Sequence, residues 1–476
     1  MSFRKVLFWT HLVAGLISGI SIGIMCFTGT VLAFEKELIA WSERDARQVA
    51  VPAGNAPKLT LEQMQAKLRE AQPELRPSGI VLQNDPSAAV AFSSGRSGGV
   101  YINPYTGEVR QPKSKAMGEF MHTMTDLHRV LGFHGENSRP VGKMINGVCN
   151  LAFFVLAITG LYLWMPRNWS WRAVRPVIWF RQNLSSKARD FNWHNAIGFW
   201  SAPILIVLTL TAVPISFRWG GTLIYTLTGT EAPAAGAAGP AAFGPPVEVP
   251  TPAPGSKPLS QDVLFAAAQK AVPNWETITL RTGSPTGRGG PGGPRGGAAA
   301  TVAPGGEARP APTPESTKGP SATSPEGSSR KGRGGEGRAP GGPGGETRSG
   351  DRGGAGVAGG GASATPQAVS FTIRESNSWP RTASTTLSLD PFTGATLRRT
   401  GYADMNAAQQ VRSWTRFLHT GEALGDGGQF FAGLACLGGV FLVYTGFALS
   451  WRRFFGKKPA APATVRSVEP EASAVR

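Results

Sequence analysis

HLVAGLISGISIGIMCFTGTVLAF (residues 11–34) and HNAIGFWSAPILIVLTLTAVPISF (residues 194–217) are two copies of one pattern. Each begins with a histidine and continues as an uncharged apolar run of about 23 residues, where about 20 cross the hydrocarbon core of a bilayer. An ionisable ring beside a membrane core is costly and usually has a function. The repeat therefore predicts two ligands, on two helices, for one shared group. The offsets are identical throughout, because His11, Gly15, Ser18, Thr28 and Phe34 correspond to His194, Gly198, Ser201, Thr211 and Phe217.

Four such runs are present, at about 12–34, 144–166, 195–217 and 428–451, and none contains a charged residue. Each is long enough to be a transmembrane helix. The first follows Arg4 and Lys5, but it is too long for a signal peptide and lacks a clean cleavage site, so we expect an uncleaved anchor.

Basic residues predict the orientation. The loop at 167–193 and the tail after the fourth run are rich in Arg and Lys, which favours the cytoplasmic side. Both termini are then expected in the cytoplasm, with segments 35–143 and 218–427 outside. The net charge of +18 resides in these loops and in a Gly/Pro/Arg tract, and no nucleic-acid-binding motif accompanies it. Lipid bilayer is the expected partner, and nucleic acid is not.

The two outer segments also repeat each other. Residues 59–72 and 259–272 have the pattern of amphipathic helices, each opened by a Thr or Ser cap. Strand-like pieces follow, with a Pro-aromatic-Thr-Gly turn at 103–107 and again at 390–394. The expected fold class is therefore a membrane all-α four-helix transmembrane bundle with two small α+β extracytoplasmic domains.

The second outer segment is interrupted at 284–367 by Gly, Pro, Ala, Ser and Arg with almost no large apolar side chain, which predicts a disordered insertion that serves as a spacer. The expected units follow in chain order: transmembrane helix 1 (1–36), first outer domain (37–115), amphipathic connector helix (116–140), transmembrane helix 2 (141–166), basic cytoplasmic loop (167–193), transmembrane helix 3 (194–218), second outer domain (219–283 and 368–410), connector and transmembrane helix 4 (411–453), and cytoplasmic tail (454–476).

Several kinds of site are disfavoured. Cys26, Cys149 and Cys436 all lie within apolar runs, so helix packing is the simplest role for them, and neither disulfides nor a zinc or iron–sulfur site is expected. The sequence has no Rossmann fingerprint or phosphate-binding loop, and no GxSxG or HExxH motif. The Thr-Gly pairs inside the runs are interpreted as packing points.

The histidines form two expected pairs. His11 and His194 stand at the cytoplasmic ends of two parallel helices. His128 and His419, each preceded by Leu, stand before runs two and four on the outer side. His122 is the alternative to His128, but a helix over 116–131 places His128 beside the apolar stripe and His122 on the polar face.

Two axial histidines per site, with one site near each face, is the arrangement of a b-type electron conduit with two haems. The simpler alternative is that each ring only occupies the interface, where amphipathic side chains are common. Four histidines in duplicated contexts favour ligation, so we expect two haems b with His11, His194, His128 and His419 as axial iron ligands.

These features resemble the PepSY-associated transmembrane family of bacterial inner-membrane proteins, often described as iron-regulated. The resemblance rests on the histidine positions, on Thr28-Gly29 and on the two turns, and covers nearly the whole chain except 284–367 and the tail. It implies two PepSY domains in the periplasm, haem bound by the four histidines, and reduction of ferric siderophores. The insertion and Thr211-Ala212, where the first copy has Thr28-Gly29, depart from the pattern.

The expected function is a haem-dependent oxidoreductase that takes electrons from a cytoplasmic reductase or a quinol and reduces a periplasmic Fe(III) chelate, such as a ferric siderophore, in iron acquisition. Two alternatives stay open. One is a non-redox, membrane-anchored PepSY protein that binds peptide or envelope partners. The other is a transporter, which the absence of charge from the runs disfavours.

Overall fold

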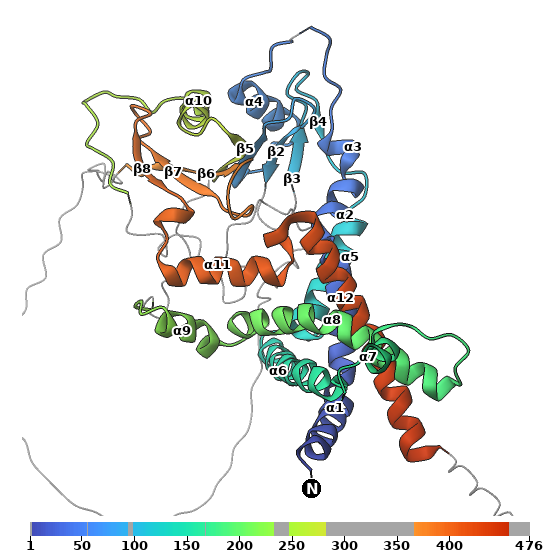
Figure 1. The fold of residues 1–476 in the computed structure, drawn as a ribbon. Coiled ribbons are helices and arrows are strands. Elements are labelled where there is room, and N and C mark those ends of the chain that lie inside the picture. Colours follow the sequence, from blue (N-terminus) through green and yellow to red (C-terminus); the bar gives the residue numbers. More distant parts are fainter. Residues whose placement is uncertain are drawn as a thin grey trace, which may run out of the picture. The chain divides into compact units, whose positions relative to one another are not determined.

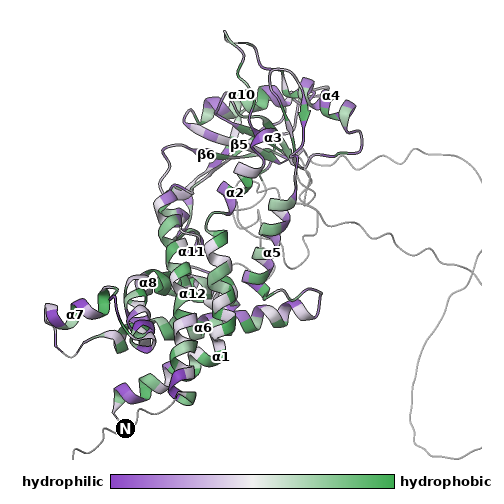
Figure 2. Cartoon of the chain, turned by 90° about the vertical axis from the view of Figure 1, so that its right-hand side faces the viewer, coloured by the Kyte–Doolittle hydropathy of each residue, from purple (hydrophilic) through white to green (hydrophobic). Residues whose placement is uncertain are grey.

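The computed structural model describes residues 2–54, 56–93, 99–166, 168–232, 247–281 and 366–456. Four of its helices are long and apolar enough to cross a membrane: α1 (Phe3–Leu32), α6 (Ser138–Trp164), α8 (Ser186–Ser216) and α12 (Gly425–Phe455). Hydrophobic residues gather along these helices (Figure 2). They cover nearly all of the four apolar runs, so the prediction of four helices able to span a membrane is confirmed.

The four long helices form a ring. Helix α1 packs against α6 and α12, and α8 packs against the same two neighbours, so α1 and α8 face each other diagonally. Small residues allow the helices to approach closely. A side chain at Gly19 would come within 2.8 Å of the Phe447 ring, and one at Gly439 would collide with the Cys26 sulfur.

Short helices precede or follow the spanning helices; all but α7, which lies in the loop between α6 and α8, connect the bundle to the outer segments (Figure 1). In each half of the chain, one of them leads directly into a spanning helix: α5 (Ala116–Val130) precedes α6, and α11 (Ala407–His419) precedes α12. The others, with two 3₁₀ turns, are α2 (Glu35–Ser42), α3 (Arg44–Arg47), α7 (Trp171–Ile178), α9 (Arg218–Leu227), η2 (Tyr402–Asp404) and η3 (Glu422–Leu424).

The outer segments build one antiparallel sheet of eight strands in the order β4-β3-β2-β1-β5-β6-β7-β8. Its strands are β1 (Gly79–Gln83), β2 (Val90–Ser93), β3 (Gly99–Ile102), β4 (Val109–Arg110), β5 (Trp275–Arg281), β6 (Val369–Glu375), β7 (Thr385–Leu389) and β8 (Thr396–Thr400). Each half supplies a meander of four strands, and the halves join where β1 pairs with β5, with Val81 opposite Thr279.

Helices α4 (Leu61–Ala71) and α10 (Gln261–Ala271) lie on the same face of this sheet (Figure 1). Beneath them one apolar core spans both halves and includes the fully buried Phe92, Ile278 and Phe371. The Asp262 carboxylate of α10 accepts a 2.7 Å hydrogen bond from the Leu61 amide at the start of α4. The halves expected as two separate domains therefore share one sheet and one core.

The two predicted turns are confirmed, and they share the same hydrogen-bond pattern. Asn103 Oδ1 accepts a 2.9 Å hydrogen bond from the Tyr105 amide, and Asp390 Oδ1 accepts one of 2.8 Å from the Phe392 amide. Each turn ends on a glycine with positive φ, Gly107 or Gly394, and joins two paired strands. Strands β5 and β6 pair directly, while the insertion predicted between them lies almost wholly outside the described residues.

Candidate functional site: two pairs of histidines

The first pair lies between diagonal helices. His11 on α1 and His194 on α8 face each other across the bundle, with ring centroids 6.5 Å apart and planes at 86°. The identical spacing of the two apolar runs explains this meeting, because equivalent positions on two-fold-related helices point toward the same axis. The chain thus brings together the two histidines that the sequence paired.

The second pair comes from the connecting helices. His128, near the end of α5, and His419, the last residue of α11, have ring centroids 6.3 Å apart and planes at 51°. Helix α5 packs on α1 and α6, and α11 packs on α8. This pair is also the one that the sequence predicted.

Every one of the four rings contacts a threonine through Nδ1. The Nδ1 to Oγ1 distances are 3.0 Å for His11–Thr159, 2.9 Å for His194–Thr445, 2.9 Å for His128–Thr28 and 3.4 Å for His419–Thr211. In each case the ring and the hydroxyl come from different helices. The four contacts therefore tie the bundle together around the two pairs.

The threonine partners determine which ring nitrogen carries the proton. The Thr159 hydroxyl lies 2.7 Å from the Val155 carbonyl of its own helix and donates its single hydrogen there. The other three threonines make the equivalent bond. Each hydroxyl is then an acceptor toward its histidine, so Nδ1 donates and Nε2 keeps a free lone pair, the arrangement of a ring that binds a metal through Nε2.

Backbone carbonyls support the same assignment for the second pair. His128 Nδ1 lies 3.1 Å from the Met25 carbonyl, and His419 Nδ1 lies 2.9 Å from the Leu208 carbonyl. A carbonyl can only accept, so both Nδ1 atoms carry hydrogen. Burial lowers the pKa of His128 to about 4 and also lowers the pKa of His419. Both rings, which lie outside the spanning helices, are therefore neutral near pH 7.

The spacing of each pair fits one metal ion between its rings. A metal lies about 2.0–2.1 Å from an imidazole nitrogen, and a ring with bonds of about 1.33 Å has a radius of about 1.1 Å. Two rings on opposite sides of one ion therefore have centroids about 6.2–6.4 Å apart. The observed 6.5 and 6.3 Å agree with this value.

Each pair supplies two nitrogens and little else. In the described ranges, no group of three or more His, Cys, Asp or Glu residues could hold a metal. A planar ligand that brings its own equatorial donors would complete the coordination. The residues present thus fit a metalloporphyrin better than a bare ion.

Glycines leave room beside the rings. A side chain at Gly160 would lie 3.1 Å from His11 Cε1, one at Gly29 would lie 3.5 Å from His128 Cε1, and one at Gly446 would lie 3.8 Å from His194 Cε1. Each of these glycines follows a threonine that contacts the same ring. The Thr-Gly pairs, interpreted from the sequence as packing points, hold and accommodate the histidines. The equal spacing of Thr28 from His11 and of Thr211 from His194 was a signal for two of the four threonines, whereas Thr159 and Thr445 lie at unequal distances from the histidines that precede them.

The remaining histidines lie apart from the pairs. His122 and His134 are 59% and 71% exposed, and each has its Nδ1 3.7 Å from the Asp126 carboxylate. Arg139 approaches the same carboxylate at 3.3 Å. His128, rather than the alternative His122, therefore faces His419.

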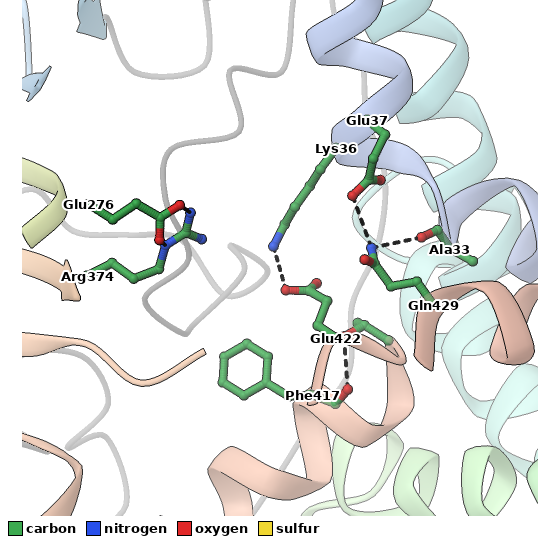
Figure 3. A network of polar contacts seen from close by, with 9 residues as sticks. Ala33, Lys36, Glu37, Glu276, Arg374, Phe417, Glu422 and Gln429 are labelled. Atoms are coloured by element: carbon green, nitrogen blue, oxygen red, sulfur yellow. Dashed lines mark hydrogen bonds and ion pairs between the residues drawn. The ribbon is translucent and has the colours of Figure 1, made fainter. Parts of the chain in front are cut away.

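Polar contacts brace the segment that follows His419 (Figure 3). Lys36 Nζ forms a 2.5 Å ion pair with Glu422, three residues beyond the histidine. Gln429 Nε2 donates to the Ala33 carbonyl at 3.1 Å and to Glu37 at 3.3 Å. These contacts fix the start of α12 against the end of α1.

A buried acid braces the opposite end of the bundle. Asp190, four residues before His194, is 1% exposed and lies 2.6 Å from Arg452 of α12 and 3.1 Å from Arg189. A carboxylate at this depth needs such partners. No pattern in the sequence singles out Asp190, because it is one acid in a strongly basic loop.

The comparisons with known proteins agree with this architecture. The family model of the PepSY-associated TM region matches residues 8–453, a span that includes both histidine pairs and the whole sheet. Among curated proteins, none matches the sequence.

Proposed function

The chain belongs to the family of the PepSY-associated TM region, and on that premise we propose that it is a membrane oxidoreductase that passes electrons across the bilayer to a periplasmic Fe(III) chelate. A ferric siderophore is the expected chelate. The proposed donor is a cytoplasmic reductase or a quinol. The observation that carries the proposal is the presence of two histidine pairs, each with the separation and the free Nε2 atoms that a shared metal requires.

The proposed cofactor is two haems b. His11 and His194 would hold one, and His128 and His419 would hold the other. When bound, haem iron supplies reversible one-electron transfer, with a potential set by its ligands and their hydrogen bonds.

Neighbouring residues hold and orient the four histidine rings that would bind the haems. The four threonines keep each Nδ1–H occupied, which fixes the ring rotation and leaves Nε2 directed away from the hydroxyl. The Met25 and Leu208 carbonyls do the same for the second pair. Apolar packing around Cys26, Phe153 and Leu205 separates the two sites and excludes water.

The two sites suit transfer along the bundle. On α1, His11 belongs to one pair and Thr28, which contacts His128, belongs to the other, a separation of about 25 Å of helix rise. We place the His11–His194 pair on the cytoplasmic side, because the basic loop, the first turn of α1 and the last turn of α12 lie at that end. Reduction of the Fe(III) chelate at the His128–His419 end would weaken the binding of iron by hard oxygen donors. The proposed reaction therefore needs no acid or base from the protein.

A reduced-minus-oxidised visible spectrum of the purified protein tests the proposal. We expect a b-type α-band and two haems per chain. His11→Ala should remove one haem and His128→Ala the other, whereas His122→Ala and His134→Ala are matched controls that keep both. A preparation without haem that still binds a peptide or an envelope protein would instead support the non-redox alternative.

A further inference from the structure

A groove of about 560 Å³ opens beside the His11–His194 end of the bundle. Residues 180–184, between α7 and α8, form one wall. Arg189, Trp193 and Ile197 of α8 and Phe441 of α12 form the other. The proposed function uses none of these side chains.

The groove is polar at one end and apolar at the other. Arg189, Trp193 and Ile197 are spaced four residues apart, so they line one face of α8 over about 12 Å. Arg181 and Arg189 lie toward the loop, while Ile197 and Phe441 lie within the apolar runs. This gradient matches a molecule with an anionic head and a hydrocarbon tail.

The polar end carries uncompensated positive charge. The groove is lined by two arginines and no carboxylate. Arg189 donates to Asp190 Oδ1 at 3.1 Å and Arg452 pairs with the same carboxylate at 2.6 Å, so one acid serves two guanidinium groups and leaves an excess positive charge. In the part of the chain that the structure describes, the Arg181 guanidinium forms no hydrogen bond or ion pair. An anionic group would complement both arginines.

The loop is held in place and lies at the depth of lipid headgroups. Asn192, 6% exposed, donates to the Pro176 and Trp179 carbonyls and accepts from the Arg181 amide at 2.9 Å. Trp179 and Trp200 form a tilted ring pair there, and both are more than half exposed. Exposed tryptophans at the end of spanning helices mark the membrane interface.

We propose that this groove binds an anionic phospholipid, with the phosphate between Arg181 and Arg189 and one acyl chain along Ile197 and Phe441. Basic pockets between spanning helices are recognised sites for such headgroups. The apolar half distinguishes a phospholipid from free phosphate. This inference does not depend on haem.

Binding of dioctanoyl phosphatidylglycerol to the full chain in detergent, followed by native mass spectrometry, tests the proposal. Arg181→Gln should weaken binding about five-fold, the effect of about one arginine near a charged lipid. Arg172→Gln removes the same charge from α7, outside the groove, and should leave binding unchanged. Phe441→Ala should weaken phosphatidylglycerol binding without changing the binding of glycerol phosphate.

Three results would overturn the proposal. If Arg181→Gln and Arg172→Gln lowered the affinity for phosphatidylglycerol equally, the lipid would be attracted to the basic loop as a whole and not to this groove. Equal affinity for phosphatidylcholine, or for glycerol phosphate, would exclude an anionic phospholipid site. Binding of a short-chain quinone in place of phosphatidylglycerol would assign the groove to an electron donor.

Discussion

Replacing Thr159 by valine should loosen the His11–His194 site more than replacing Thr28 by valine loosens the His128–His419 site. Both changes keep the shape of the side chain and remove the hydroxyl. Among the described residues, Thr159 is the one hydrogen-bond partner of the His11 ring. The His128 ring contacts Thr28 but also the Met25 carbonyl, which remains after the change.

The magnitude follows from what each ring loses. An N–H left without a partner in a buried site costs about 1–3 kcal/mol, and loss of a partner behind a metal ligand typically lowers affinity 10–100-fold. We expect about 2 kcal/mol, or roughly 30-fold faster haem loss, for Thr159→Val. Because the carbonyl still accepts in Thr28→Val, less than about 1 kcal/mol, or five-fold, is expected there.

Transfer of haem to an excess of apomyoglobin, recorded by absorbance, measures the rate of loss from each site. His11→Ala and His128→Ala identify which kinetic phase belongs to which pair. Equal rates for Thr159→Val and Thr28→Val, or faster loss from the latter, would refute the idea that Nδ1 partners hold the rings.

Three further outcomes are expected. Gly160→Ala places a methyl group 3.1 Å from the His11 ring and should lower the haem affinity of that site by about 1–2 kcal/mol. Gly446→Ala, whose methyl group lies 3.8 Å from the His194 ring, is the control that should bind haem normally in the same transfer assay. Asp190→Asn removes the buried carboxylate that faces Arg189 and Arg452. Because these two side chains are 44% and 32% exposed, water compensates part of the loss and stability should fall by about 1 kcal/mol, read as a lower temperature of unfolding by tryptophan fluorescence; an unchanged temperature would contradict this. Burial raises the pKa of Tyr101, so above about pH 10 the unfolded state releases a proton that the folded state keeps, and stability falls. Tyr101→Phe should remove this alkaline loss of stability, measured by thermal unfolding from pH 8 to 11. An identical pH profile for both proteins would exclude the mechanism.

The long elements were accessible from sequence because their signals are local. Apolar runs of sufficient length predict spanning helices whatever their neighbours are. The pairing of His11 with His194 followed from duplication, since equivalent residues meet near a two-fold axis. The position of His128 at the edge of an apolar stripe likewise distinguished it from His122.

Contacts between segments that are distant in the sequence could not be predicted in this way. The contact of His11 with Thr159 depends on which helices are neighbours in the ring, and periodicity does not contain that information. The same holds for the sheet. The sequence predicts strand-like pieces in each half, but the pairing of β1 with β5, which merges two expected domains into one, depends on how the halves dock.

The exchange of threonines between the sites has a mechanical consequence. Helix α1 provides a histidine to one pair and the threonine hydroxyl that contacts a histidine of the other pair, and α8 does the same. A continuous helix resists compression along its axis. A small axial shift of α1 or α8 would therefore move a histidine ring of one pair and, by the same amount, the threonine that contacts the other pair. The geometry of one histidine pair is thereby linked to that of the other through α1 and α8.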